Sequence, residues 1–319
     1  MAMQSQPITI YDVPNYTGQV FFQGAQIGKS PVTSAATARN GLRYVSGHQY
    51  SMSNALTGDA AQAHAVTEDA SIQAATYTSH AAAQDTNYMQ IWYRQYAQSY
   101  ARDVLNGNVS GVAATGEPLA QIGSLAIQRQ AHLMQLAADI EFSCLLGSST
   151  AWTNAATAGA TGGLLVAVEA GSETAAAGAA LSKTLIATET ARMAAAGAEF
   201  TDMLIAGGAH QIQVLNTLYG FAEQSRTMGG VALDTVLVPL LGRCSVVYDP
   251  IMNTDDLAFI DLAHFQVCIG QKAGADSMGV LVEPIGKIGA GVYEQIWAMF
   301  GVDYHDIIYH GMVSGLATS

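Results

Sequence analysis

The segment from Glu117 to Gly147 constrains the fold of this chain more than any other stretch. Pro118 suits a first helical turn, where a backbone N–H needs no partner, and Gly147 is a natural stop. About 30 residues at roughly 1.5 Å per residue make a rod about 45 Å long. Apolar residues recur at steps of three and four, as on one helix face, at Leu119, Ile122, Ala126, Leu133, Leu136, Ile140 and Cys144. We therefore predict a long helix against which much of the chain packs.

The charge content limits the classes of partner. The 319 residues can bury a sizeable core, yet only 12% are charged, about half the usual share for a soluble protein. Such a surface suits a protein covered by neighbours, and it equally suits an Ala- and Gly-rich monomer. The net charge is −13, and the four lysines are far apart, at Lys29, Lys183, Lys272 and Lys287. Tight binding of nucleic-acid phosphates is therefore not expected.

The cysteines and the apolar runs point to a protein without disulfides or a membrane span. Cys144, Cys244 and Cys268 are odd in number, far apart and in apolar surroundings, which predicts buried free thiols in a reducing compartment. No run approaches the roughly 18 apolar residues of a membrane span. Residues 1–10 lack the basic and apolar regions of a signal peptide. We expect no membrane partner.

The chain before the long helix divides into an arm and a loop. Residues 1–48 carry glycines, prolines and scattered aromatic residues without a helical period, which predicts an extended arm. Its aromatic side chains could dock on another surface, or the arm could be an ordinary extension. Residues 49–87 are rich in Ala, Ser and Thr and bury little area, which predicts a protruding loop. From Thr86 to Tyr96 the periods of helix and strand conflict, and the β-branched and aromatic residues favour a strand for the first half.

The chain after the long helix reads as a mixed domain. Leu164 to Val166 is interpreted as a short buried strand or turn between two loops. Helices are predicted for residues 181–196, with Ser182 or Thr184 as the N-cap, and for 207–220. Strands are predicted for residues 201–205, 235–238, 244–248, 257–260, 280–284 and 290–301, with a turn at 249–255 and a final strand-like segment at 304–315.

Residues that could carry chemistry are few. His305 and His310 lie close together near the C-terminal end, but two histidines in a strand-like run are more often structural. Asp255, Asp256 and Asp261 fit a turn and a strand edge better than an acid pair. Asp139 and Glu141 lie two residues apart, so they do not share a helix face. No phosphate loop, dinucleotide fingerprint, nucleophile elbow or paired-histidine metal motif occurs. We predict no catalytic residue, no metal, no cofactor and no enzyme activity.

The order of these segments and several short motifs resemble a known family. The chain resembles the major capsid proteins of tailed phages with the Hong Kong 97-type fold, in the branch typified by phage SU10. The motifs span roughly residues 85–316, and they are Asn87 to Trp92, Gly116-Glu117 with Gln121, Asp139-Ile140-Glu141, Gly163-Leu164, Gly242 to Val247, Asp261, and His310 to Leu316.

The resemblance implies an α+β fold and a division of the chain. Residues 1–48 would be the N-terminal arm, 49–87 the extended loop, 88–180 the peripheral domain with its spine helix at 117–147, and 181–300 the axial domain. Residues 301–319 would be a C-terminal strand that returns to the peripheral domain. The founding member joins its subunits through a lysine in the extended loop, whereas here no lysine occurs between Lys29 and Lys183.

The implied function is an icosahedral phage head around double-stranded DNA. Its partners would be further copies of the chain in hexamers and pentamers, together with scaffolding, portal and decoration proteins. The DNA would be enclosed without sequence-specific binding. The protein would be assembled in the host cytoplasm and would end in the virion. Two alternatives stay open: an encapsulin-like compartment, and a soluble enzyme with a site near His305 and His310.

Overall fold

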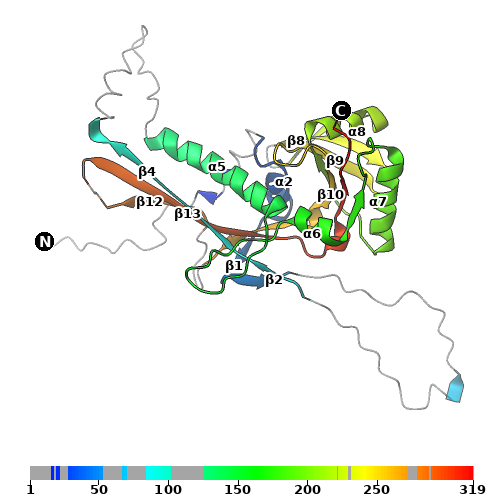
Figure 1. The fold of residues 1–319 in the computed structure, drawn as a ribbon, viewed down its shortest axis with the longest axis horizontal. Coiled ribbons are helices and arrows are strands. Elements are labelled where there is room, and N and C mark those ends of the chain that lie inside the picture. Colours follow the sequence, from blue (N-terminus) through cyan, green and yellow to red (C-terminus); the bar gives the residue numbers. More distant parts are fainter. Residues whose placement is uncertain are drawn as a thin grey trace, which may run out of the picture.

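A computed structural model describes residues 16–17, 19–21, 28–52, 67–69, 84–101, 125–220, 222–228, 231–271, 279–286 and 289–318. For residues 222–228 and 231–232 it describes the backbone alone. The described elements form two regions (Figure 1). In the first region a long helix lies along an elongated sheet. In the second region a pair of helices packs on another sheet.

The elongated sheet, called the long sheet below, is built on β13 (Gly291–Asp303). One edge of β13 pairs antiparallel with β4 (Gln90–Ser99). Its other edge pairs with β12 (Leu281–Ile285) and, further along, with β11 (Gln266–Gly270). β1 (Leu42–Val45) adds in parallel beside β11. The predicted strand at the start of Thr86 to Tyr96 is confirmed by β3 (Thr86–Tyr88) and β4, and it continues because β13 supplies a full-length pairing partner.

The long helix α5 (Leu125–Leu146) covers one face of the long sheet. Residues 117–124 of the predicted helix lie outside the described residues, and the predicted stop at Gly147 is confirmed. Leu133, Leu136, Ile140 and Cys144 of the predicted stripe are fully buried, as expected. Ala126 is exposed instead, because the buried residues of α5 are confined to the stretch of the helix from Leu133 onward.

The second sheet has seven strands. Their order is β5 (Glu173–Ala175), β14 (Gly311–Ser314), β10 (Leu257–Asp261), β6 (Met203–Gly207), β9 (Gly242–Tyr248), β8 (Val231–Val238) and β7 (Ala222–Met228). Every residue of β6 and β10 is buried. α7 (Lys183–Ala195) and α8 (Ala209–Tyr219) pack on one face through a cluster that includes Ile186, Leu215 and Phe259. The opposite face joins the core beneath α5.

Most elements predicted for this second region are confirmed. The strands at 201–205, 235–238, 244–248 and 257–260 correspond to β6, β8, β9 and β10, and the two helices correspond to α7 and α8. Ser182 is the N-cap of α7, and its hydroxyl accepts a hydrogen bond from the Leu185 backbone N–H at 3.3 Å. Polar caps and amphipathic spacing are local signals, so they can be recognised in the sequence without knowledge of the tertiary partners.

Two segments depart from the prediction. The arm at residues 1–48 was expected to lack helix, yet α2 (Pro31–Asn40) lies inside it and buries Pro31 through Ala36. Pro31 suits the start of a helix, and small side chains let α2 approach its neighbours closely. The segment at Leu164 forms the helix α6 (Leu164–Gly171) rather than a strand or turn, because Leu164, Leu165 and Val168 face the core together.

The C-terminal residues are distributed differently from the predicted division at residue 300. β11, β12 and β13 belong to the long sheet, although they lie largely within the range expected for the axial domain. The last strand, β14, lies in the seven-stranded sheet between β5 and β10, so it does not return to the long sheet. A short 3-10 helix, Ile307–Tyr309, precedes it. Apolar runs predict strands, but they do not say which strands pair.

The ends of the predicted extended loop are described, and most of its interior is not. β2 (Gln49–Ser51) pairs antiparallel with β3 at the root of the loop. Residues 53–66 and 70–83 lie outside the described residues.

Candidate functional site

The histidine pair proposed from the sequence as a catalytic alternative belongs to a packed joint. His310 is fully buried. Its Nε2 lies 3.0 Å from the Tyr304 carbonyl oxygen, and its Nδ1 accepts the Asp261 backbone N–H at 3.3 Å. Such a ring carries its single proton on Nε2. Burial lowers the pKa of His310 to about 4, so it stays neutral near pH 7. Both ring nitrogens are occupied by backbone groups, which indicates a structural role.

Asp261 organises the other side of this joint. Its carboxylate accepts backbone N–H groups of Thr201, Asp202 and Ala263, at 3.0 to 3.3 Å. The His264 ring lies 3.1 Å from the same carboxylate and stacks on Tyr309 with 3.7 Å between ring centroids. These contacts tie the end of β10 to the segment before β14. The second candidate, His305, meets the His264 ring edge to face, with 5.6 Å between ring centroids.

The remaining acidic candidates and the cysteines are also structural. Asp256 accepts hydrogen bonds from Asn253 and from the Gly315 backbone N–H, which confirms the turn interpretation. Cys144, Cys244 and Cys268 are free and buried, as predicted, and burial raises the pKa of each thiol, to about 12 for Cys244 and Cys268. Within the described residues, no group of three or more His, Cys, Asp or Glu side chains could hold a metal ion.

Asp139 and Glu141 point in different directions, as their spacing predicts. Asp139 accepts the Trp92 indole N–H at 2.6 Å and so fastens α5 to β4. Glu141 is fully buried, and its carboxylate accepts the backbone N–H groups of Val32 and Thr33 at the start of α2. Sequence reasoning missed this second contact. Residue 32 lies 109 positions away, and a Glu in an apolar stripe was the only local signal.

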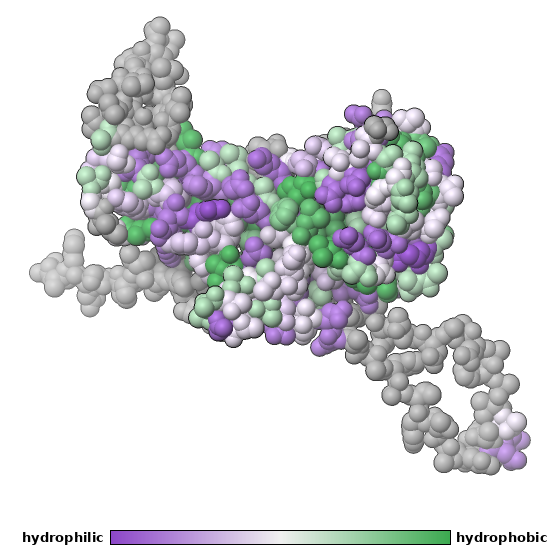
Figure 2. Space-filling view, viewed as in Figure 1, coloured by the Kyte–Doolittle hydropathy of each residue, from purple (hydrophilic) through white to green (hydrophobic). Residues whose placement is uncertain are grey.

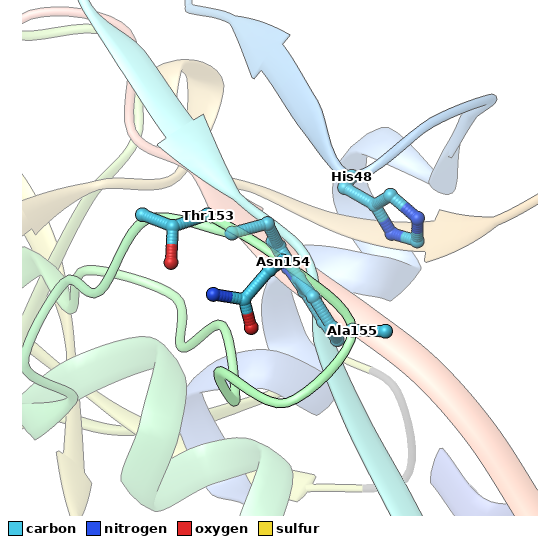
Figure 3. A pocket seen from close by; sticks show the side chains of 5 residues that line it. His48, Thr153, Asn154 and Ala155 are labelled. Carbon is cyan, nitrogen blue, oxygen red and sulfur yellow. The ribbon is translucent and has the colours of Figure 1, made fainter.

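An open pocket of about 490 Å³ lies between β2 and the loop after α5. His48 stands on one side, and Thr153, Asn154 and Ala155 of the loop lie opposite (Figure 3). The His48 ring stacks on Trp152 with 4.7 Å between centroids. The side chains of Thr153 and Asn154 form hydrogen bonds within the loop itself, with Ala156 and Thr157. The hydrogen-bonding groups of these two side chains are therefore engaged within the loop rather than directed at a ligand.

The described residues expose several large apolar side chains, and many of them fall into three sets. One set lies on or beside β4: Ile91, Tyr93 and Tyr100. Another lies on α5 and α6, with Phe142 and Val166 exposed by 53% and 38%. The third lies on β8, β9 and their connection, where Leu237, Leu240 and Tyr248 are exposed by 73%, 60% and 51%. Where exposed apolar side chains form a contiguous patch, they mark a surface suited to protein contacts, whereas single ones are common on monomers.

Figure 2 shows the surface over α5 and α6. Hydrophilic residues run along α5, and a hydrophobic area lies where α5 meets α6 (Figure 2). None of the described helices is both long enough and apolar enough to cross a bilayer.

β4 gives the clearest case of a surface built by alternation. Trp92 and Tyr96 are buried toward α5, so Ile91 and Tyr93 point to the opposite face. There Tyr93 lies opposite Trp297 of β13, and its hydroxyl donates to the Gln295 side-chain oxygen at 3.2 Å. Ile91 and Tyr93 are exposed by 41% and 46%. We call the side chains of Ile91, Tyr93, Gln95, Gln295 and Trp297 the open face.

Comparisons with known proteins agree with a shell protein. The sequence profile described as SU10 major capsid protein matches residues 9–317. No curated protein sequence gives a significant match. The structure resembles the capsid asymmetric unit of cyanophage A-1(L), with 11% identity, a TM-score of 0.56 and coverage of 90% of this chain and 94% of that chain.

Two further solved structures share the fold. The satellite phage P4 procapsid including size determination (Sid) protein has 12% identity and a TM-score of 0.51, with coverage of 99% and 94% of the two chains. The SrpI encapsulin from Synechococcus elongatus PCC 7942 has 10% identity and a TM-score of 0.51, with coverage of 90% and 89%. At these identities the likeness shows the fold alone. The Hong Kong 97-type fold expected from the sequence is thereby confirmed.

Proposed function

This chain belongs to the SU10 major capsid protein family, and on that premise we propose that many copies of it close into an icosahedral shell of hexamers and pentamers around double-stranded DNA. The observation that carries the proposal is the family match, which covers residues 9–317 of the 319. Its role as a major capsid protein is structural.

The surface chemistry supports a subunit covered by neighbours. Only 12% of the residues are charged, so copies can meet without desolvating many ions. The open face and the exposed apolar side chains of the β8–β9 connection offer area for such contacts. Interfaces are typically poor in charge and rich in aromatic groups at their centres. The open face fits that description.

The two sheets suggest a division of labour within the shell. The long sheet and α5 would form the peripheral domain of the subunit, and the seven-stranded sheet with α7 and α8 would form the axial domain. α5 would be the spine that keeps the peripheral domain straight. The predicted extended loop at residues 49–87 would overlap a neighbouring copy, with its root at the β2–β3 pair.

The other partners follow from the family role and the charge. A net charge of −13 suits a lining that encloses DNA without sequence-specific binding. Scaffolding, portal and decoration proteins would be separate chains. Subunits would be held by non-covalent contacts, since no lysine lies between Lys29 and Lys183 to form a cross-link in the loop. Assembly would take place in the host cytoplasm, and the product would be the virion.

The encapsulin alternative shares the fold, so the fold does not separate it from a phage head. The family match favours the phage head. The enzyme alternative near His305 and His310 is less favoured, because both ring nitrogens of His310 already bond to backbone groups.

The contents of assembled particles test the proposal. Particles that contain the chain are purified, treated with nuclease, opened and analysed for DNA and for other proteins. We expect nuclease-protected double-stranded DNA. Particles that hold one abundant enzyme and no DNA would instead identify an encapsulin-like compartment. A chain that sediments as a small uniform oligomer from infected cells would contradict both shell functions.

A further inference from the structure

Glu141 of α5 is buried where the two regions of the molecule meet. Its Oε1 accepts the Val32 backbone N–H at 2.7 Å, and its Oε2 accepts the Thr33 backbone N–H at 2.9 Å and the Thr33 hydroxyl. The carboxyl group thus caps the first turn of α2, where free N–H groups favour an acceptor. α2 contacts β11 of the long sheet as well as β8 and β9 of the seven-stranded sheet. A change at Glu141 therefore acts on both regions.

A second buried carboxyl group lies beside the first. Asp249 follows β9 directly and is 0% exposed. Its Oδ1 accepts the Ile251 backbone N–H at 2.9 Å, whereas its Oδ2 is buried without a hydrogen-bond donor when both acids are ionised. The neighbouring Glu141 is the side chain that can hydrogen-bond Asp249. Two carboxylates are both acceptors, so they cannot bond to each other until one of them carries a proton.

We propose that Glu141 and Asp249 share one proton, and that this proton locks α5, α2 and the end of β9 together until rising pH removes it. A proton between the acids supplies the donor that Asp249 Oδ2 lacks. It also leaves one negative charge, rather than two, in the dry interior. This inference does not depend on the shell function, because it concerns the folded subunit itself.

The groups that face the pair come from each packed element. α5 contributes Glu141 and, one turn on, the buried thiol of Cys144. α2 contributes only the backbone N–H groups of Val32 and Thr33 and the Thr33 hydroxyl. The segment after β9 contributes Asp249 and the Ile251 N–H. Burial, reinforced by Asp249, raises the pKa of Glu141 well above its usual range, and burial raises the pKa of Asp249 as well.

The direction of the pH effect follows from these shifts. In the unfolded chain Glu141 releases its proton near a pKa of about 4.3. The folded pair keeps a proton above that pH, so the folded state binds one proton more than the unfolded state. The part of the folding stability that this pair contributes is therefore greatest at acid pH, and it falls as the pH rises toward the raised pKa of the pair. In that window the unfolding equilibrium constant rises about tenfold per pH unit from this pair.

The test compares unfolding across pH in the wild type and three variants of the full chain. Urea unfolding is followed by circular dichroism between pH 5 and pH 9. Asp249→Asn places an amide donor where the shared proton lies and should fold. Glu141→Gln supplies a donor as well, but its amide nitrogen cannot accept an α2 N–H group as the carboxyl oxygen does, so this variant should fold with lower stability. Both should lose the contribution of about tenfold per pH unit. Asp139→Asn is the matched control, because Asp139 lies on the same helix but faces Trp92, and it should keep the wild-type slope.

Infrared spectroscopy gives a second reading that a purely structural role would not produce. The wild type at pH 7 should show a protonated-carboxyl stretching band that Glu141→Gln lacks and Asp139→Asn retains. The proposal is overturned if Glu141→Gln and Asp249→Asn both keep the wild-type pH slope. It is equally overturned if both variants fail to fold, because a neutral donor at either position would then not replace the proton.

Discussion

Strands β10 and β4 are built on opposite plans. All five residues of β10 are buried, and its sequence, Leu257 to Asp261, is almost wholly apolar. β4 alternates instead, with Trp92 and Tyr96 buried toward α5 and with Ile91 and Tyr93 left exposed. A strand covered on both faces reads as a continuous apolar run, and a strand covered on one face alternates. β4 departs from the second pattern, because part of its uncovered face, at Ile91 and Tyr93, is apolar too.

The difference indicates what each sheet does. The seven-stranded sheet is completed by its own chain, through α7 and α8 on one face and the core beneath α5 on the other. The long sheet is covered by α5 on one face, whereas among the described residues its other face is covered only toward the β11 end, by a small cluster that includes Tyr50, Met89 and Met299. The open face then needs a partner outside the chain, which in a shell is another copy. Substitutions should therefore affect folding at β10 and assembly at β4.

The largest expected loss of folding comes from a substitution in α5, whose buried residues pack in the core that the two sheets share. Leu133→Asp would place a charge in a fully buried site, and we expect insoluble or unfolded protein. Ile127→Asp is the matched control on the exposed stretch of the same helix, where Ile127 is 42% exposed, and it should fold normally. Soluble expression and circular dichroism measure both. Normal shells from Leu133→Asp would show that the buried face of α5 is assigned wrongly.

The next effect compares aromatic residues of the two sheets. Phe259→Ala in β10 should lower the free energy of unfolding by about 3–5 kcal/mol, because it removes a fully buried ring. Tyr93→Ala on the open face should change it by well under half as much, since 46% of Tyr93 is already in water. Urea unfolding of the unassembled subunit measures both values. Equal losses would remove the contrast between the sheets.

A smaller effect is expected on the folding stability at acid pH. His310 ties the end of β10 to β14, and its lowered pKa of about 4 favours the neutral ring in the folded state. Stability should be intact above the unfolded pKa of about 6.5 and should fall on acidification toward pH 4, by on the order of 3 kcal/mol. His310→Gln offers a neutral donor and acceptor and should flatten this fall. Unfolding at pH 7 and pH 4.5 measures it, and an unchanged fall in His310→Gln would assign the acid sensitivity elsewhere.

Substitutions on the open face should have the smallest effect on the stability of the subunit but a large effect on its assembly. Ile91→Ser with Tyr93→Ser removes two exposed apolar groups, so the subunit should lose only about 1 kcal/mol or less of stability. Shell formation should be lost or strongly reduced, because neighbours would no longer gain from covering the open face. Gln213→Ala, at an exposed polar position of α8, serves as the control and should assemble normally. Normal shells from the double variant would exclude the open face as a required contact.

Local signals explain which segments of the fold could be predicted. The apolar run of β10, the Ser182 cap of α7 and the end of α5 near Gly147 are set by neighbours in sequence. α2 was missed because its buried residues are mostly small, among them Thr33, Ser34 and Ala35. Its burial depends on close approach to other elements rather than on an apolar stripe.

Long-range partners explain the rest. β14 pairs with β10 and β5, and nothing in residues 311–314 says so. The contact between Glu141 and Asp249 joins groups 108 positions apart (249 minus 141) whose pairing no spacing rule reports. The motif Asp139-Ile140-Glu141 is one of those that carry the family resemblance. It includes Glu141, but the motif alone does not indicate what Glu141 contacts. In the structure, Asp139 fastens α5 to β4, and Glu141 fastens α5 to α2.

A cryo-electron microscopy reconstruction of particles assembled from the purified chain tests the central claim most directly. We expect closed shells in which neighbouring copies cover Ile91 and Tyr93, while β6 and β10 remain inside each subunit. Shells that leave the open face in solvent would contradict the assigned role of the long sheet. A uniform small oligomer with no particles would contradict the shell function itself.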